Sequence, residues 1–95
     1  MSTPKPPPGY LNVLYFAGAS SYTGKDYERW PAPLPLTKLL SDLEARYPGM
    51  QAKVLATCMM TVNLDYVDVP DAGETDSLVL QEFDEVAIIP PVSAG

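Results

Sequence analysis

Residues 36–47 read Leu-Thr-Lys-Leu-Leu-Ser-Asp-Leu-Glu-Ala-Arg-Tyr and form the clearest helical pattern of the chain. Apolar side chains recur there at the spacing of one helix face, and they are Leu36, Leu39, Leu40, Leu43 and Tyr47. The pair Pro48-Gly49 predicts where the helix ends. One amphipathic helix has to bury its apolar stripe against a second layer, so this stretch predicts a two-layer α+β domain.

Before the helix, a strand is predicted over Tyr10–Ala17 by the alternation of its apolar side chains. Leu14 and Phe16 share one face of this strand, and the opposite face carries Leu11, Val13, Tyr15 and Ala17. Residues 19–24 are expected to turn or to form a short helix, and residues 25–30 to return as the second strand of a hairpin. This hairpin begins the second layer that the helix needs.

The segment after the helix supplies the remaining strands. Residues 54–64 are rich in apolar and β-branched side chains, and their strand is expected to centre on Val62-Asn63-Leu64. Beyond it we predict a strand or turn at 66–69, a polar loop at 71–77, a short extended piece at 78–80 and a final strand at 86–89. The first and last strands are apolar enough to be central neighbours. This order matches a β-grasp, the ubiquitin-like fold, with a mixed sheet of four to five strands packed on one main helix.

Both ends of the chain are expected to lie outside this domain, which we place at residues 10–89. Residues 1–9 contain four prolines and predict an extended, mobile lead. At the other end Pro90 and Pro91 stiffen the exit of a flexible tail, residues 90–95, which continues with Val92, Ser93, Ala94 and Gly95. Gly95 has no Cβ to hinder attack on its carbonyl, so this ending fits a reactive tail as well as a frayed terminus.

The composition excludes several classes of function. The chain has 95 residues, no histidine, one cysteine and a net charge of −6. It therefore lacks the residues for Ser-His or Cys-His triads, for a histidine metal site and for an internal disulfide, which points to a cytoplasmic protein without a metal. The negative charge argues against nucleic-acid binding, and no apolar run is long enough to cross a membrane. An enzyme that works alone is not expected.

Charge and exposed apolar residues indicate where a partner binds. Residues 54–95 carry eight acids and no base. This half serves solubility, or it steers the tail toward a basic groove on a partner, with Asp84 and Glu85 just before the final strand as the main contributors. Leu14 and Phe16 face away from the helix, and we therefore predict that they form an apolar partner interface.

Two further side chains have a structural and a functional interpretation. Cys58 has the residue type to carry a persulfide, but its neighbours Met59 and Met60 favour a core position. Trp30 has the residue type of an interface anchor, but packing at the end of the hairpin is favoured.

Three segments of the sequence together indicate a family. They are Val13-Leu14-Tyr15-Phe16-Ala17, Val62-Asn63, and Asp84-Glu85-Val86-Ala87-Ile88-Ile89-Pro90-Pro91-Val92-Ser93 before a terminal glycine. The set resembles the small subunit of molybdopterin synthase, the sulfur carrier of molybdenum cofactor biosynthesis. The resemblance covers residues 10–95, and its last segment is the specific one. This chain has Ala94 and Phe83 at two positions where that family usually has glycine.

The resemblance implies a β-grasp fold with chemistry at the last glycine. It implies that a ubiquitin-activating-type enzyme uses ATP to adenylate Gly95, and that sulfur from a persulfide then gives a thiocarboxylate. It further implies that the tail, Pro90 to Ala94, enters the large catalytic subunit of a heterotetramer of two small and two large chains. There the sulfur goes to a pyranopterin precursor and forms the molybdopterin dithiolene. ATP and the catalytic groups belong to the partners, so no cofactor is expected on this chain.

Other functions stay open at this stage. Carriers for thiamine and for tRNA thiolation share the fold and the glycine ending, and a ubiquitin-like modifier joins its last glycine to target lysines. A third alternative is a binding module whose tail is inert, so that it neither carries sulfur nor joins to lysines. The Pro90-Pro91 pair favours the molybdopterin synthase carrier, whereas Ala94 is the one feature that favours an inert tail.

Overall fold

The computed structural model describes residues 3–70 and 78–91. Its elements are β1 (Tyr10–Tyr15), α1 (Gly18–Thr23), β2 (Tyr27–Pro31), β3 (Leu34–Pro35), α2 (Leu36–Arg46), the π-helical turn η1 (Gln51–Leu55), β4 (Met59–Val62), β5 (Asp65–Val67), β6 (Val79–Leu80) and β7 (Glu85–Ile89). The predicted order of two strands, one main helix and further strands is confirmed. The polar loop predicted at 71–77 lies outside the described residues.

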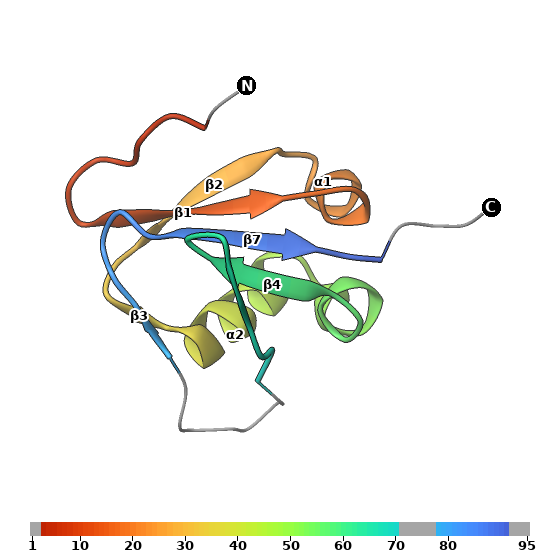
Figure 1. Cartoon of the computed structure of the whole chain (residues 1–95). Coiled ribbons are helices and arrows are strands. Elements are labelled where there is room, and N and C mark those ends of the chain that lie inside the picture. The colour runs from red at the N-terminus through yellow and green to blue at the C-terminus, as the bar shows by residue number, and fades with distance from the viewer. Residues whose placement is uncertain (1–2, 71–77, 92–95) are drawn as a thin grey trace.

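Five strands form the main sheet in the order β2-β1-β7-β4-β5 (Figure 1). The two central strands β1 and β7 run parallel, with Val13 opposite Val86, and the other pairs are antiparallel. Strands β3 and β6 form a separate two-stranded pair. The predicted β-grasp is therefore confirmed, including the placement of the first and last strands side by side.

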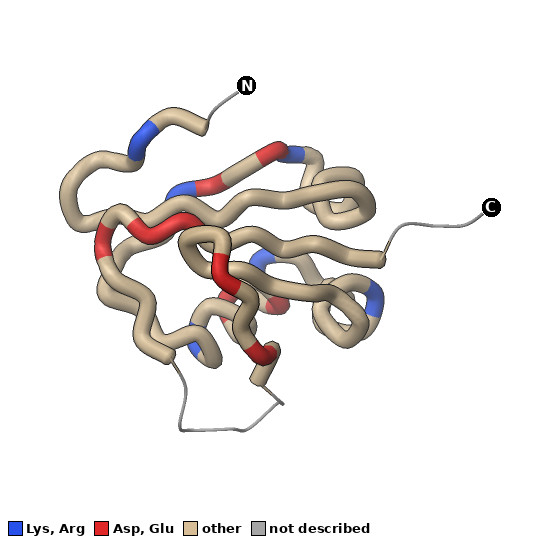
Figure 2. The backbone as a smooth tube through the Cα atoms, in the orientation of Figure 1, with Lys and Arg blue, Asp and Glu red and all other residues tan. Residues whose placement is uncertain are grey.

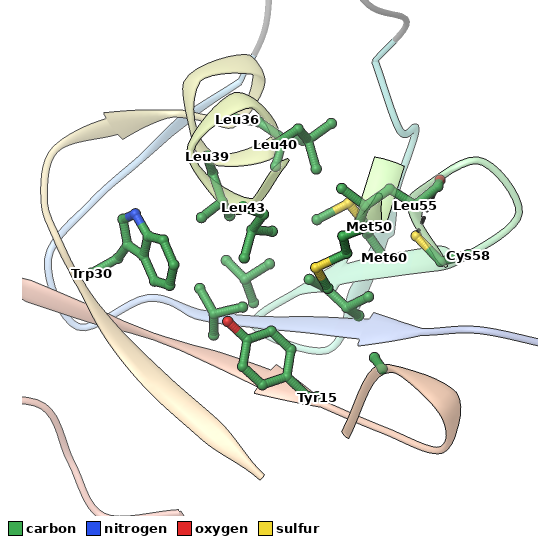
Figure 3. Packing of buried hydrophobic residues seen from close by; sticks show 14 of the residues in the cluster. Tyr15, Trp30, Leu36, Leu39, Leu40, Leu43, Met50, Leu55, Cys58 and Met60 are labelled. Carbon is green, nitrogen blue, oxygen red and sulfur yellow. Dashed lines mark hydrogen bonds between the residues drawn. The ribbon is translucent and has the colours of Figure 1, made fainter. Parts of the chain in front are cut away.

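Helix α2 covers one face of the sheet and contributes four leucines to the core. Its leucine stripe is buried as predicted, because the side chains recur on the face that meets the sheet. Figure 3 shows this stripe with the side chains packed near it: Leu36, Leu39, Leu40 and Leu43 with Trp30, Met50 and Met60. The alternate residues Leu11, Val13, Val86 and Ile88 of the central strands are fully buried beneath it.

One carboxylate is buried at the edge of this core. Glu28 on β2 is 9% exposed; its Oε1 accepts hydrogen bonds from the hydroxyls of Tyr15 (2.7 Å) and Tyr47. Its Oε2 accepts from Nζ of Lys25 and from a guanidinium nitrogen of Arg46, both at 3.0 Å. Burial by itself would raise the pKa of Glu28, but these donors outweigh burial and lower that pKa below its ordinary value. The cluster ties β2 to β1 and to the end of α2.

The prediction of one strand over residues 54–64 is wrong in part. The π-helical turn η1 occupies the start of this stretch, and β4 ends at Val62. Asn63 and Leu64, expected at the centre of the strand, form the two-residue turn between β4 and β5 with φ of 51° and 74°. Such a turn matches the twist of a hairpin, and asparagine tolerates its positive φ. The Asn63 Oδ1 also accepts the backbone N–H of Glu85 (3.0 Å), which fixes the turn to β7.

The first strand is shorter than predicted. β1 ends at Tyr15, and Ala17, expected on the buried face, is exposed with a φ of 49°. The chain bends out of the sheet there to enter α1, and Ala19 takes the fully buried position instead. The predicted faces of the rest of β1 are confirmed, since the buried residues are Leu11, Val13 and Tyr15.

Residues 3–9 differ from the mobile lead predicted from their prolines. They lie against the sheet on the side away from α2 (Figure 1). The backbone N–H of Tyr10 donates to the Pro7 carbonyl (3.1 Å), and Gly9 has a φ of 85°. Pro8 and Gly9 thus stand at the second and third positions of a β-turn, where proline and glycine are favoured. This turn reverses the chain over β1. The sequence prediction missed it because it treated the prolines only as residues without a backbone N–H donor.

Candidate functional site

The predicted tail leaves the domain from the middle of the sheet. β7 lies between β1 and β4 and ends at Ile89. Pro90 is still buried and Pro91 is exposed, so the chain reaches the surface within two residues. The proline rings restrict φ at both positions, which gives the exit a fixed direction. The other predicted tail residues lie outside the described residues: Val92, Ser93, Ala94 and Gly95.

Apolar side chains surround this exit. Phe16 is 46% exposed, and its backbone N–H donates to the Ile88 carbonyl (3.1 Å) at the end of β7. Met59 is 51% exposed and pairs with the half-buried Ile89 across β4 and β7. We call Phe16, Met59 and Ile89 the exit patch. An apolar patch beside the start of a tail is suited to hold a partner that also takes up the tail.

The sequence identified part of this surface. Leu14 and Phe16 do lie on the sheet face away from the helix, with Leu14 half-buried and Phe16 exposed. Met59 was missed because it was considered only as a neighbour of Cys58. Met60 is fully buried, and successive strand residues point to opposite faces, so Met59 faces out. The alternation within β4 was the signal that identifies it.

A groove of about 560 Å³ adjoins the exit patch along β1 and β2. Its lining residues are Thr3, Pro4, Leu14, Tyr15, Phe16, Ala17, Ser20, Asp26 and Tyr27. The one charged side chain among them is Asp26, whose carboxylate accepts a hydrogen bond from the Ser20 hydroxyl (3.2 Å). The groove therefore combines mostly apolar walls with an anionic group at one place on its rim.

Asp84 and Glu85, the acids predicted to steer the tail, lie at the other end of β7 from the exit (Figure 2). The Asp84 carboxylate accepts hydrogen bonds from the Asn63 side-chain amide (3.0 Å) and from the Gln81 backbone N–H (2.8 Å). The backbone N–H of Glu85 donates to the Asn63 side chain. In this structure Asp84 holds the β4–β5 turn and the approach to β7 together.

The two ambiguous residues are part of the core, as favoured from the sequence. Cys58 is 9% exposed; its thiol lies 3.5 Å from the Leu55 carbonyl, and burial raises the pKa of the thiol. Trp30 is 4% exposed, and the Arg46 guanidinium lies 4.5 Å from its ring centroid. Within residues 3–70 and 78–91 there is no cluster of histidine, cysteine, aspartate or glutamate that could hold a metal ion.

Comparison with known proteins gives the family. The ThiS family model matches residues 13–95, which include the end of β1, all of β7 and the tail. The chain belongs to the ThiS family. The prediction of a sulfur-carrier resemblance is thereby confirmed at the level of the family. In the described part of this ThiS family chain, no helix is both long enough and apolar enough to cross a membrane.

Curated relatives carry a more specific name. The chain is 51% identical over the full length of both chains to the molybdopterin synthase sulfur carrier subunit of Phaeosphaeria nodorum. It is 52% identical to the subunit of that name from Emericella nidulans, over 90% of this chain and 97% of the relative. The human subunit of that name is 37% identical over 90% of this chain and 93% of its own length. The resemblance predicted from the three sequence segments is confirmed.

Solved structures agree on the fold. SAMP1 from Haloferax volcanii superposes with a TM-score of 0.66 at 20% identity, over 92% of this chain and 100% of that one. A chain from the protein-protein complex of subunits 1 and 2 of the molybdopterin-converting factor from Helicobacter pylori superposes with a TM-score of 0.61 at 20% identity. The match covers 90% of this chain and 99% of that one. At this identity the likeness shows a shared β-grasp fold.

Proposed function

We propose that this ThiS family chain is the sulfur carrier subunit of a molybdopterin synthase and that Gly95 carries the sulfur. The observation that carries the proposal is the 51% identity with the Phaeosphaeria nodorum sulfur carrier subunit over 100% of both chains. A match of that extent includes the C-terminal residues on which carrier chemistry depends.

The chemistry requires activation of the C-terminal carboxylate. An ionised α-carboxylate, with an ordinary pKa of about 3.3–3.7, is a poor electrophile at neutral pH. Transfer of AMP from ATP to the Gly95 carboxylate, with release of pyrophosphate, creates an acyl group that sulfur attacks. The outer sulfur of an enzyme persulfide then attacks the acyl carbon and displaces AMP, which gives an acyl disulfide. A second thiol of that enzyme cleaves the acyl disulfide, so that a thiocarboxylate is released and an enzyme disulfide is formed. These steps belong to a ubiquitin-activating-type enzyme, so we expect this chain to bind neither ATP nor a metal of its own.

The second partner is the large catalytic subunit. We infer that the thiocarboxylated tail enters its active site and donates its sulfur to the pyranopterin precursor, which leaves Gly95 as a carboxylate. Two carriers in turn supply the two sulfur atoms of the molybdopterin dithiolene. The rigid exit at Pro90 and Pro91 and the exit patch beside it support this inference, because one docking event then positions the tail. We expect two small and two large chains in the complex, formed in the cytosol.

Intact mass spectrometry tests the proposal. The chain is incubated with the activating enzyme, ATP and a sulfur donor, and the expected product has one oxygen replaced by sulfur. A variant that lacks Gly95 is the matched control; it should keep its thermal stability, since no described core residue follows Pro90, and should gain no sulfur. Formation of molybdopterin with the Gly95 deletion would refute the carrier function.

The same measurement separates the other functions. A branched conjugate between the last glycine and a lysine of another protein would identify a ubiquitin-like modifier. An unchanged mass under conditions in which a known carrier is thiolated would identify an inert binding module. Sulfur transfer to tRNA or to a thiamine precursor, in place of the pyranopterin, would assign the chain to another sulfur pathway.

A further inference from the structure

The proline-rich lead is attached to the domain at three places. The side-chain amide of Asn12 donates to the Pro4 carbonyl (2.8 Å), and the backbone N–H of Gly9 donates to the Glu82 carboxylate (2.8 Å). The ammonium of Lys5 lies 4.7 Å from the ring centroid of Phe83. Between these contacts Pro6 is buried. A segment with a buried residue and three separate contacts is part of the folded surface.

Two residues that contact the lead, Asn12 and Phe83, are in energetically unfavourable situations, and each makes a stabilising contact with the lead. Asn12 is 3% exposed on the sheet face away from α2, and a polar side chain buried there is unfavourable unless it is hydrogen-bonded. Its Nδ2 is satisfied by the Pro4 carbonyl, whereas its Oδ1 has no partner among the described residues. Phe83 has a φ of 67°, which is unfavourable for a bulky side chain, and its ring is the one over which Lys5 lies. Both positions are adapted to a docked lead.

The lead forms a wall of the groove and leaves the groove open. Thr3 and Pro4 of the lead line it together with Leu14, Phe16 and Tyr27. Phe16 stays 46% exposed, so the lead borders the exit patch without covering it. Phe16 belongs to both surfaces, which makes the groove continuous with the exit patch.

We propose that residues 3–9 are a docking element of this chain, and that the groove they complete takes an apolar side chain of the large subunit with a neighbouring lysine or arginine. This inference rests on the proposed function for the identity of the partner. The apolar walls and the volume suit a large apolar side chain. Asp26 is the single acid that lines the groove, and its negative charge is complementary to a lysine or arginine next to that apolar side chain.

The test compares the affinity of three variants for the large subunit of the same organism by titration calorimetry. Deletion of residues 2–4 removes the wall but keeps the turn and the Lys5 contact, and we expect binding at least about tenfold weaker, or roughly 1.4 kcal/mol. Asp26→Asn is expected to weaken binding and to reduce its dependence on salt. Asp42→Asn is the matched control, because it also removes one carboxylate but lies on α2, outside the lead and the groove. Its affinity should equal that of the wild type.

Equal affinity of the wild type and the deletion variant would overturn the docking element and leave the proposed function intact. Tighter binding by the deletion variant would also overturn it, since the lead would then be a cover that the partner displaces. Absence of binding by the wild type would refute the proposed partner itself. A measurement on the isolated chain decides the anchoring separately: the backbone ¹⁵N NOE of Lys5 should approach that of Val13, and a value typical of a free terminus would overturn the inference.

Discussion

The buried carboxylate of Glu28 provides the sharpest test of how this small domain is held together. In Glu28→Gln the side-chain amide loses least when its oxygen still accepts from the two phenols and its nitrogen points toward Lys25 and Arg46. Those two cations are both about half exposed, so they can turn to water. The phenol hydrogen bonds then lose their charged acceptor, at about 1 kcal/mol each, and the buried amide N–H groups face cations, at about 1–3 kcal/mol. We therefore expect a loss of about 3–5 kcal/mol.

A loss of that size is a large part of the stability of a domain of this length, which is typically about 5–10 kcal/mol. Urea denaturation at pH 7 measures it, and the thermal midpoint should fall by roughly 12–40 °C. The matched control is Asp42→Asn, which breaks the exposed Lys38–Asp42 pair (2.8 Å) and should cost less than about 0.5 kcal/mol. A loss below about 1 kcal/mol in Glu28→Gln would refute the view that the carboxylate is the organising acceptor of this cluster.

The pH dependence of the same pair of proteins gives an independent check. The pKa of Glu28 is lower in the folded chain than its ordinary value of about 4.3, so its stabilising contribution is complete above that ordinary value. As the pH falls through the folded-state pKa, the carboxylate takes up a proton and the contribution is lost. The stability difference between wild type and Glu28→Gln should thus be constant near neutral pH and shrink below about pH 4. A difference that does not change with acidification would contradict this assignment.

The remaining predictions concern the interface, the tail and one turn. Phe16→Asp should leave the thermal midpoint nearly unchanged, because the side chain is largely exposed, but should abolish binding to the large subunit in calorimetry; unfolding of the isolated variant would contradict the face assignment. Ala94→Gly should be silent in thermal melts and should hold or improve thiocarboxylate formation by intact mass, since it restores backbone freedom; lost activity would show that the partners are shaped around the methyl group. Leu64→Gly should stabilise the fold by about 0.5–1 kcal/mol in urea denaturation, because Leu64 is 82% exposed at a φ of 74°; a destabilised variant would show that its side chain contributes more than its backbone costs.

The sequence by itself determined the helix and strands that are encoded by the spacing of side chains within one short segment. The leucine spacing in residues 36–47 encodes a buried helix face, and the alternation in β1 separates Leu11 and Val13 from Leu14 and Phe16. The order of these elements was enough to predict the β-grasp. The three quoted segments, of which the ending at Pro90 and Pro91 is the specific one, were enough to indicate the family.

Only the tertiary structure decided the features that depend on residues far apart in the chain. Glu28 looks like an ordinary polar strand residue, and its burial is tolerable because Arg46 and Tyr47, 18 and 19 residues later, bring donors to it. The lead is docked because Gly9 meets Glu82, which is 73 residues away. The free energy of a buried charge or of a docked terminus is set by the partners that the fold brings to it. A local pattern of side chains contains no information about those partners, so such contacts follow from the fold and not from the periodicity.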